Sequence, residues 1–266
     1  MTETSIVGTS SRGKRKLDEF STKIGLHKLN MVPDKCTKLF IDVGTAIDAP
    51  NSANWLLNYE DAYVIGIEPS PVNIAILQEG RPANVSFAYL RLADDSVIRH
   101  GAKVGDIGGR FCLLQCAIDN VDKSTTAPFY LTDERNTGCS SLLKPTAKLG
   151  LNVDEIYQTP VISLKTVLDN TPFDKFEYVT YLKTDAQGKD LDVVKSSKEY
   201  LEKVLILQME VSTGGQYEDE QDLEELESYV LSQGFVTIGG TFRDRIYRNK
   251  KLAAKVDDPM VQFLRT

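Results

Sequence analysis

The sequence of 266 residues predicts an α/β fold: a mostly parallel sheet with helices on both faces and an antiparallel hairpin at the C-terminal end. Two observations lead to this prediction. Short apolar runs typical of buried strands alternate with segments of helical pattern through most of the chain. The last two strand-like runs, 235–242 and 244–249, follow one another across a short turn, which is typical of a hairpin.

The individual elements follow from apolar runs, turn residues and helix-start signals. Buried strands are predicted at 37–43, 62–68, 111–118, 127–132, 176–184 and 203–211. Helices are predicted at 51–60, 72–78, 163–170, 188–200 and 218–233, the second of them behind a proline that a first helical turn tolerates. Residues 81–110 are predicted to contain a glycine-rich loop or insertion. Residues 133–160 hold many Thr, Ser, Gly and Pro residues and are predicted to be irregular.

Length and composition indicate one globular domain over 23–266, behind a flexible basic leader over 1–22. The chain is 41% apolar and 26% charged, as soluble domains are. It has no apolar stretch long enough to span a membrane and no signal-peptide core. We therefore expect a cytoplasmic protein without a membrane partner.

The charge is uneven along the chain. The net charge is −7, but residues 1–30 carry +3, so the rest carries −10. A body this acidic is a poor match for a nucleic-acid backbone. The basic cluster at 13–16 leaves nuclear targeting open as an alternative. The acidic helix expected at 218–233 is predicted to present a solvated face.

Four cysteines, Cys36, Cys112, Cys116 and Cys139, and two histidines are too few and too scattered for a structural zinc site. A disulfide framework is not expected in a chain of this length. Cys112 and Cys116 lie in an apolar run and are predicted to be buried thiols.

Polar residues end four of the predicted strands: Asp42 with Gly44, Glu68, Asp185 and Glu210. In an open parallel sheet, ligands bind beyond the carboxyl ends of the strands, so these residues are expected along one edge. Glu68 lies 24 positions after Gly44, close to the spacing at which an acidic residue holds ribose hydroxyls. The sequence thus predicts a nucleoside site.

The turn after the first strand has no Gly-x-Gly-x-x-Gly pattern, so it offers no glycine loop for a pyrophosphate. A ribose-binding acid without a phosphate loop is typical of S-adenosylmethionine, which contains a ribose and an adenine but no phosphate.

Seven segments, in this order, resemble the FkbM family of methyltransferases: 40–47, 66–73, 114–120, 139–142, 161–170, 181–196 and 205–211. The resemblance covers about residues 37–250, and the Lys-x-Asp-x-x-Gly element from Lys183 to Gly188 is its most specific part. It implies a Rossmann-like class I methyltransferase fold and O-methylation of a hydroxyl, often on a sugar. The chain departs from the family at Asp48, where a second glycine is usual, and at Gln187, where glutamate is usual.

The resemblance also implies roles for the residues at the sheet edge. The cofactor would be contacted by Asp42 and Gly44 at its methionine part, by Glu68 with the adjoining Pro69 at its ribose, by Cys116 and Ala117 at its adenine, and by Ser140 and Ser141 from a covering loop. Asp185 and Glu210 would face a carbohydrate acceptor.

Methyl transfer from a sulfonium is an in-line displacement, so the acceptor oxygen has to be aligned with the methyl carbon. An aliphatic hydroxyl also needs a base or a metal to take its proton. Asp185 is the predicted base, Lys183 is predicted to orient it or to bind the substrate, and Glu210 is expected beside it. Asp185 and Glu210 could instead hold Mg²⁺ or Mn²⁺ through their oxygens.

Two other functions remain open at this point. One is a cofactor-binding regulatory module without catalysis, which the departures at Asp48 and Gln187 would permit. The other is a nucleic-acid methyltransferase guided by the basic leader, against which the acidic body argues. The pattern does not indicate the sugar, the hydroxyl or the oligomeric state.

Overall fold

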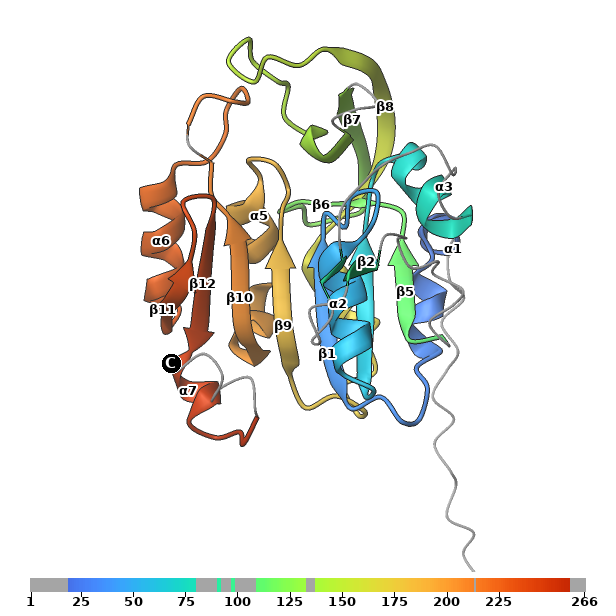
Figure 1. Cartoon of the computed structure of the whole chain (residues 1–266), viewed down its shortest axis with the longest axis vertical. Helices are drawn as coiled ribbons and strands as arrows, with labels where there is room; N and C mark the ends of the chain where they lie inside the picture. Colours follow the sequence, from blue (N-terminus) through green and yellow to red (C-terminus); the bar gives the residue numbers. More distant parts are fainter. Residues whose placement is uncertain are drawn as a thin grey trace, which may run out of the picture.

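The computed structural model describes residues 19–79, 90–91, 97–98, 109–132, 137–212 and 214–258 (Figure 1). The basic cluster at 13–16 and most of 81–110 lie outside these ranges, so the predictions made for them are not addressed. Within the described part of the chain, no helix has the length and apolar character needed to cross a membrane.

A seven-stranded sheet forms the centre of the fold, with the order β11-β12-β10-β9-β1-β2-β5. Its strands are β1 (Lys38–Val43), β2 (Ala62–Ile67), β5 (Phe111–Leu114), β9 (Val179–Thr184), β10 (Val204–Glu210), β11 (Phe235–Gly240) and β12 (Asp244–Asn249). The strands from β5 to β10 pair in parallel, whereas β12 pairs antiparallel with both β10 and β11. The prediction of a mostly parallel sheet is confirmed.

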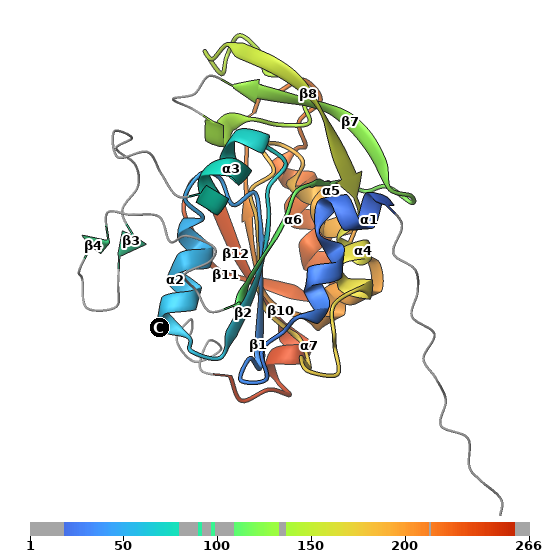
Figure 2. The same ribbon diagram turned by 90° about the vertical axis from the view of Figure 1, so that its right-hand side faces the viewer.

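Helices lie on both faces of this sheet (Figure 2). One face carries α2 (Pro50–Asn58) and α3 (Pro71–Glu79), and the other carries α1 (Glu19–Ile24), α4 (Leu164–Asp169), α5 (Asp190–Lys195) and α6 (Leu223–Ser232). The short helix α7 (Lys250–Ala253) follows β12, and 3₁₀ turns span Leu26–Asn30, Thr137–Cys139 and Lys198–Lys203.

Local sequence explains where several of these helices begin. The Ser163 side chain accepts a hydrogen bond from the Thr166 backbone at the start of α4, and Asp222 accepts two at the start of α6. Pro50 and Pro71 occupy first turns, where a missing N–H costs nothing. The helix predicted at 218–233 is therefore shorter than expected, because its first turn is set by Asp222.

Apolar residues pack in two clusters, one on each side of the sheet. On the α2 side, the ring of Phe40 stacks on Trp55 with centroids 5.1 Å apart, and Trp55 meets Tyr181 at 5.2 Å. On the other side, Leu164 and Val194 are fully buried. Both faces are thus covered by side chains that alternate along the strands.

A three-stranded sheet stands above the carboxyl ends of the central strands (Figure 1). It contains β6 (Ala117–Ile118), β7 (Thr125–Thr132) and β8 (Val153–Ile162), in the order β6-β8-β7. A pair of two-residue strands, β3 (Leu90–Arg91) and β4 (Val97–Ile98), completes the set.

This smaller sheet corrects two predictions. The segment 133–160 is not irregular throughout, because its residues from Val153 onward pair antiparallel with β7. The apolar run 111–118 is not one strand, because β5 ends at Leu114 and β6 belongs to the smaller sheet. In addition, the helix predicted at 188–200 is divided into α5 and a 3₁₀ turn, with Lys198 in the left-handed backbone region at φ 51°.

The N-terminal boundary and the cysteines can also be located. Helix α1 begins at Glu19, inside the leader predicted over 1–22, and its Phe20 packs against the core. Cys36, Cys112 and Cys116 are buried free thiols, and Cys139 is half-buried.

Candidate active site

A cavity opens at the carboxyl ends of β1, β2 and β9. The strand order reverses between β1 and β9, and this switch point is where open α/β sheets bind ligands. Seven predicted site residues line the cavity: Gly44, Glu68, Pro69, Cys116, Ala117, Ser140 and Asp185. The other four, Asp42, Ser141, Lys183 and Glu210, do not line it and lie behind its walls.

The end of β1 is held by a buried carboxylate. One oxygen of Asp42 accepts hydrogen bonds from the hydroxyl and the backbone N–H of Ser52, at 2.6 and 3.2 Å. The other oxygen lies 3.3 Å from the ammonium of Lys183. Asp42 is fully buried, and its hydrogen bonds hold the turn between β1 and α2. The cavity is lined by the residues that follow it, beginning with Val43.

Gly44 forms the floor of the cavity where β1 and β9 end side by side. Its φ is +76°, and a Cβ at this position would meet the backbone oxygen of Asp185 at 2.0 Å. Only glycine fits here, both for its backbone conformation and for this close approach.

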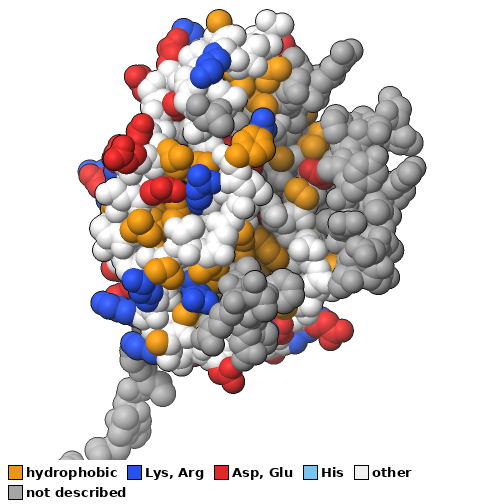
Figure 3. Space-filling model, turned by 60° about the vertical axis from the view of Figure 1, so that its left-hand side comes forward, with side chains coloured by type: hydrophobic (Ala, Val, Ile, Leu, Met, Phe, Trp, Pro, Cys, Tyr) orange, Lys and Arg blue, Asp and Glu red, His pale blue; other side chains and the backbone are white. Residues whose placement is uncertain are grey.

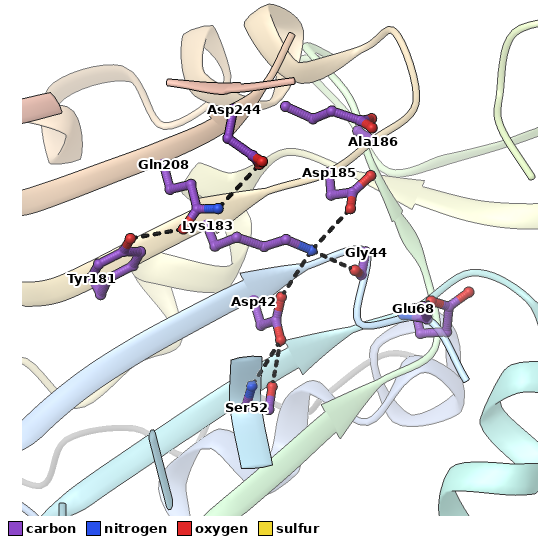
Figure 4. Close-up of polar contacts among 12 residues, drawn as sticks. Asp42, Gly44, Ser52, Glu68, Tyr181, Lys183, Asp185, Ala186, Gln208 and Asp244 are labelled. Atoms are coloured by element: carbon purple, nitrogen blue, oxygen red, sulfur yellow. Dashed lines mark hydrogen bonds and ion pairs between the residues drawn. The ribbon is translucent and has the colours of Figure 1, made fainter. Parts of the chain in front are cut away.

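Lys183 connects the ends of β1 and β9 (Figure 4). Its ammonium donates to the Gly44 carbonyl at 2.8 Å and lies 3.4 Å from Asp185. Burial alone would lower the pKa of Lys183, but the carboxylates of Asp185 and Asp42 raise it above its usual value. Lys183 is thus a buried cation that orients the residues around it.

Glu68 lies at the far end of the cavity, after β2. One carboxylate oxygen accepts from the backbone N–H of Ser70 at 2.9 Å and from the side chain of Asn73 at 3.2 Å, and the other accepts from the backbone N–H of Ala46 at 2.9 Å. Burial raises the pKa of Glu68 to about 7, although these hydrogen bonds and Lys183 oppose the shift.

This end of the cavity combines polar acceptors with an apolar wall. The second oxygen of Glu68 accepts one hydrogen bond, from Ala46, and can accept another, and the buried Oδ1 of Asn73 has no hydrogen-bond partner among the described residues. The adjoining wall is apolar, with Ile67, Cys116, Ala117, Ile118 and Phe129. Such a slot with a few polar groups at its end is typical of cofactor sites, and S-adenosylmethionine needs both parts.

The two serines have different surroundings. Ser140 lines the cavity, and its hydroxyl lies 3.2 Å from that of Thr132 and accepts from the Thr132 backbone. Ser141 is 1% exposed and donates to the backbone carbonyl of Gln187 at 2.8 Å. Ser141 therefore supports the chain after Asp185 from behind the cavity wall.

Asp185 and Glu210 end neighbouring strands, and the side-chain amide of Gln187 joins them. Its nitrogen donates to Asp185 Oδ1 and to Glu210 Oε2, each at 2.7 Å. The Gln187 oxygen lies 2.6 Å from the hydroxyl of Tyr217. The predicted acceptor-side carboxylates are thus joined by Gln187, which the sequence marks as a departure from the family, and Gln187 is held by Tyr217, which the sequence does not mark.

The two carboxyl groups differ in charge state. Burial opposes ionisation of Asp185, but the Lys183 ammonium, a hydrogen bond from the Glu210 carboxyl group and the Gln187 amide outweigh it and hold the pKa below its usual value. Burial and the negative charges of Asp185 and Asp190 raise the pKa of Glu210. A pair separated in this way has one ionised and one protonated member at neutral pH.

A metal centre lacks support in the described ranges, where no three His, Cys, Asp or Glu residues are grouped so that they could hold an ion. Asp185 and Glu210 supply two carboxylates, and the third group between them is an amide nitrogen, which is not a ligand for Mg²⁺.

One signal points to Gln187: it lies inside the Lys183–Gly188 element, two residues after Asp185, where the family usually has glutamate. No comparable signal marks Tyr217, Asn73 or Phe129. Their contacts with the site depend on how the loops after the strands fold back on one another.

Comparison with protein-family models gives a match to the methyltransferase FkbM domain over residues 42–237. The chain therefore belongs to the FkbM methyltransferase family, and the family of the protein is established over most of its length. Searches of curated proteins and of solved structures returned no match.

Proposed function

We propose that this protein is an S-adenosylmethionine-dependent O-methyltransferase that acts on a sugar hydroxyl. The observation that carries the proposal is a single cavity with a carboxylate at each end. Glu68 lies at the nucleoside-shaped end, and Asp185 lies at the other end beside Gly44. The strand order around this cavity supports a Rossmann-like class I methyltransferase fold.

The residues assigned to the cofactor divide by chemistry. Glu68 would accept hydrogen bonds from the ribose hydroxyls, and the apolar wall with Cys116 and Ala117 would pack on the adenine. The backbone at Gly44 would approach the amino-acid part. Pro69 and Ser140 also line this space, whereas Asp42 and Ser141 act from behind it by holding the turns.

When bound, the cofactor supplies a methyl group on a positively charged sulfur. The acceptor oxygen would displace the sulfur from this methyl carbon, and the sulfur would leave with the bonding electrons as a neutral thioether. The hydroxyl proton goes to Asp185, whose side chain is 35% exposed and ionised. Lys183 orients Asp185, and Glu210 lies beside it as the protonated partner.

A carbohydrate acceptor is supported by the charge of the chain. The net charge is −7, and the face in Figure 3 carries acidic, basic and apolar side chains together. Neutral hydroxylated chains meet less repulsion there than a phosphate backbone would. The free cysteines support a cytoplasmic location for this enzyme, because thiols persist in a reducing compartment.

The test is a transfer assay on the purified full chain with labelled cofactor. Neutral oligosaccharides and RNA are offered as acceptors, and binding of S-adenosylhomocysteine is measured separately by calorimetry. Label should appear in an oligosaccharide and be unaffected by a chelator. If label appears in RNA and in no oligosaccharide, the acceptor is a nucleic acid and not a sugar. If the protein does not bind S-adenosylhomocysteine, the cofactor assignment is wrong.

A further inference from the structure

The amide of Gln187 occupies the position between the two acceptor-side carboxylates. Its nitrogen lies 2.7 Å from one oxygen of Asp185 and 2.7 Å from one oxygen of Glu210. An amide NH₂ group has two hydrogens, so both are used in these two bonds. The nitrogen therefore lies where a cation bound by both carboxylates would lie.

The orientation of this amide is determined by its neighbours. If the amide were turned over, its oxygen would face two carboxyl groups, which is unfavourable next to the ionised Asp185. In the observed orientation the oxygen lies 2.6 Å from the Tyr217 hydroxyl, which is a donor. Tyr217 is 3% exposed, and its hydroxyl also lies 2.9 Å from the Cys139 carbonyl.

The backbone at Gln187 is held as firmly as its side chain. Gln187 has φ 50° in the left-handed region, followed by Gly188 at φ 94°. The Ser141 hydroxyl donates to the Gln187 carbonyl at 2.8 Å, and Ser141 is buried. Gln187, in the loop after β9, is thus contacted by two other loops: the one that contains Ser141 and the one after β10 that contains Tyr217.

The Gln187 nitrogen contacts both carboxyl groups, and Asp185 and Glu210 also hydrogen-bond to each other. A divalent cation bridging them would have to displace these interactions, and it would need further oxygen ligands. The other oxygen of Asp185 is directed to the Lys183 ammonium at 3.4 Å, which would repel a cation. The residues present therefore do not fit a bridging ion.

We propose that Gln187 is a positioning residue whose amide, fixed by Tyr217, takes the place of a bridging cation and holds Asp185 toward the acceptor. This inference rests on the proposed function for the role of Asp185. Its core, that the Gln187 amide and not a cation joins the two carboxyl groups, is tested without any acceptor.

The first measurement is the binding of Mn²⁺ alone to the full chain. The concentration of free Mn²⁺ is read from its electron paramagnetic resonance signal. Gln187→Glu places a third carboxyl group between the other two, and we expect it to bind Mn²⁺ at least about tenfold more tightly than the unaltered protein. The matched control is Gln233→Glu, which adds the same charge at an exposed residue at the end of α6.

Two results would overturn the proposal. One is a single saturable Mn²⁺ site in the unaltered protein that Asp185→Asn removes. The other is Gln187→Glu binding Mn²⁺ no better than Gln233→Glu. Binding of S-adenosylhomocysteine to each variant shows that the variant is folded.

The second measurement is kinetic and uses Gln187→Met, which keeps the length of the side chain but makes no hydrogen bond, and Tyr217→Phe. We expect kcat to fall by about tenfold or more for the first and by less for the second, with KM for the cofactor within about threefold. Unchanged kcat in Gln187→Met would refute the positioning role. If the unaltered protein binds S-adenosylhomocysteine but methylates no acceptor, the proposed function fails while the Mn²⁺ result still decides the inference.

Discussion

The two ends of the cavity hold their carboxylates in different ways. At the cofactor end, Glu68 accepts from two backbone N–H groups, those of Ala46 and Ser70, and from one side chain. At the acceptor end, the Asp185–Glu210 pair is held by two side chains, the Lys183 ammonium and the Gln187 amide.

The difference separates what the fold provides from what side chains provide. Backbone donors remain whatever residues carry them, so the geometry around Glu68 follows from the turns after β1 and β2. The acceptor end depends on side chains that single substitutions can change. A methyltransferase built in this way can keep its cofactor site while its acceptor site varies.

The largest effect is expected from Asp185→Asn, which keeps the shape of the side chain and removes its charge. If Asp185 takes the hydroxyl proton, kcat should fall by about 10²-fold or more, because general bases contribute roughly that much. Affinity for S-adenosylhomocysteine should stay nearly constant, so kinetics and calorimetry together separate the two ends. Normal turnover by this variant would move the base to Glu210 or Lys183.

Glu68→Ala should have the opposite pattern. Each hydrogen bond from a ribose hydroxyl to a charged acceptor contributes about 1.5–3 kcal/mol, so we expect affinity for S-adenosylhomocysteine to fall by about tenfold or more. Calorimetry measures the change, and a retained unfolding midpoint is the control for folding. Unchanged affinity would remove Glu68 from the cofactor site.

The pH dependence of binding sharpens the same contrast. The pKa of Glu68 is raised to about 7, so its carboxylate form is present above this pH and is lost as the pH falls through it. Because the carboxylate is the better acceptor for ribose hydroxyls, affinity should weaken by about tenfold between pH 8 and pH 6.

Glu68→Gln is the control for this pH dependence. Asp190 also has a raised pKa, and any slope that remains in Glu68→Gln would measure its contribution. Equal affinity at pH 6 and pH 8 in the unaltered protein would contradict the prediction.

The smallest effect is expected from deleting residues 1–18, which carry no apolar pattern. Activity should stay within about a few-fold, because the segment is polar, and the residues given for the cavity lining, which belong to the described ranges, begin at Val43. The matched comparison is a deletion through Ile24, which removes the buried Ile24 and the core contact of Phe20 and should lower the thermal midpoint. Loss of activity in the shorter deletion would contradict this expectation.

The parallel part of the central sheet could be predicted because its strands, from β5 to β10, are mostly buried and rich in apolar residues. The strands ending at Val43, Ile67 and Glu210 lie within two residues of their predicted ends. In contrast, the first six residues of β8 are largely exposed and carry no apolar alternation, because they pair with β7 beyond the core.

The candidate site divides in the same way. Residues that follow strands directly, such as Gly44, Glu68 and Asp185, could be predicted from their position at a strand end. The contact between Gln187 and Tyr217 joins residues 30 positions apart through a loop without periodicity. The sequence contains the residues of such a contact but no pattern that pairs them.

The meeting of Gly44 with the end of β9 also ties the site to the folding equilibrium. The hydrogen bond between Gly44 and Lys183 joins residues that are 139 positions apart in the sequence. Neither half of the chain therefore contains the cavity by itself. A ligand of this cavity binds the native state and not the unfolded chain. At a concentration one hundred times its Kd, such a ligand would add about 2.7 kcal/mol to the free energy of unfolding. The survival of the protein in a cell would then follow the supply of its own cofactor.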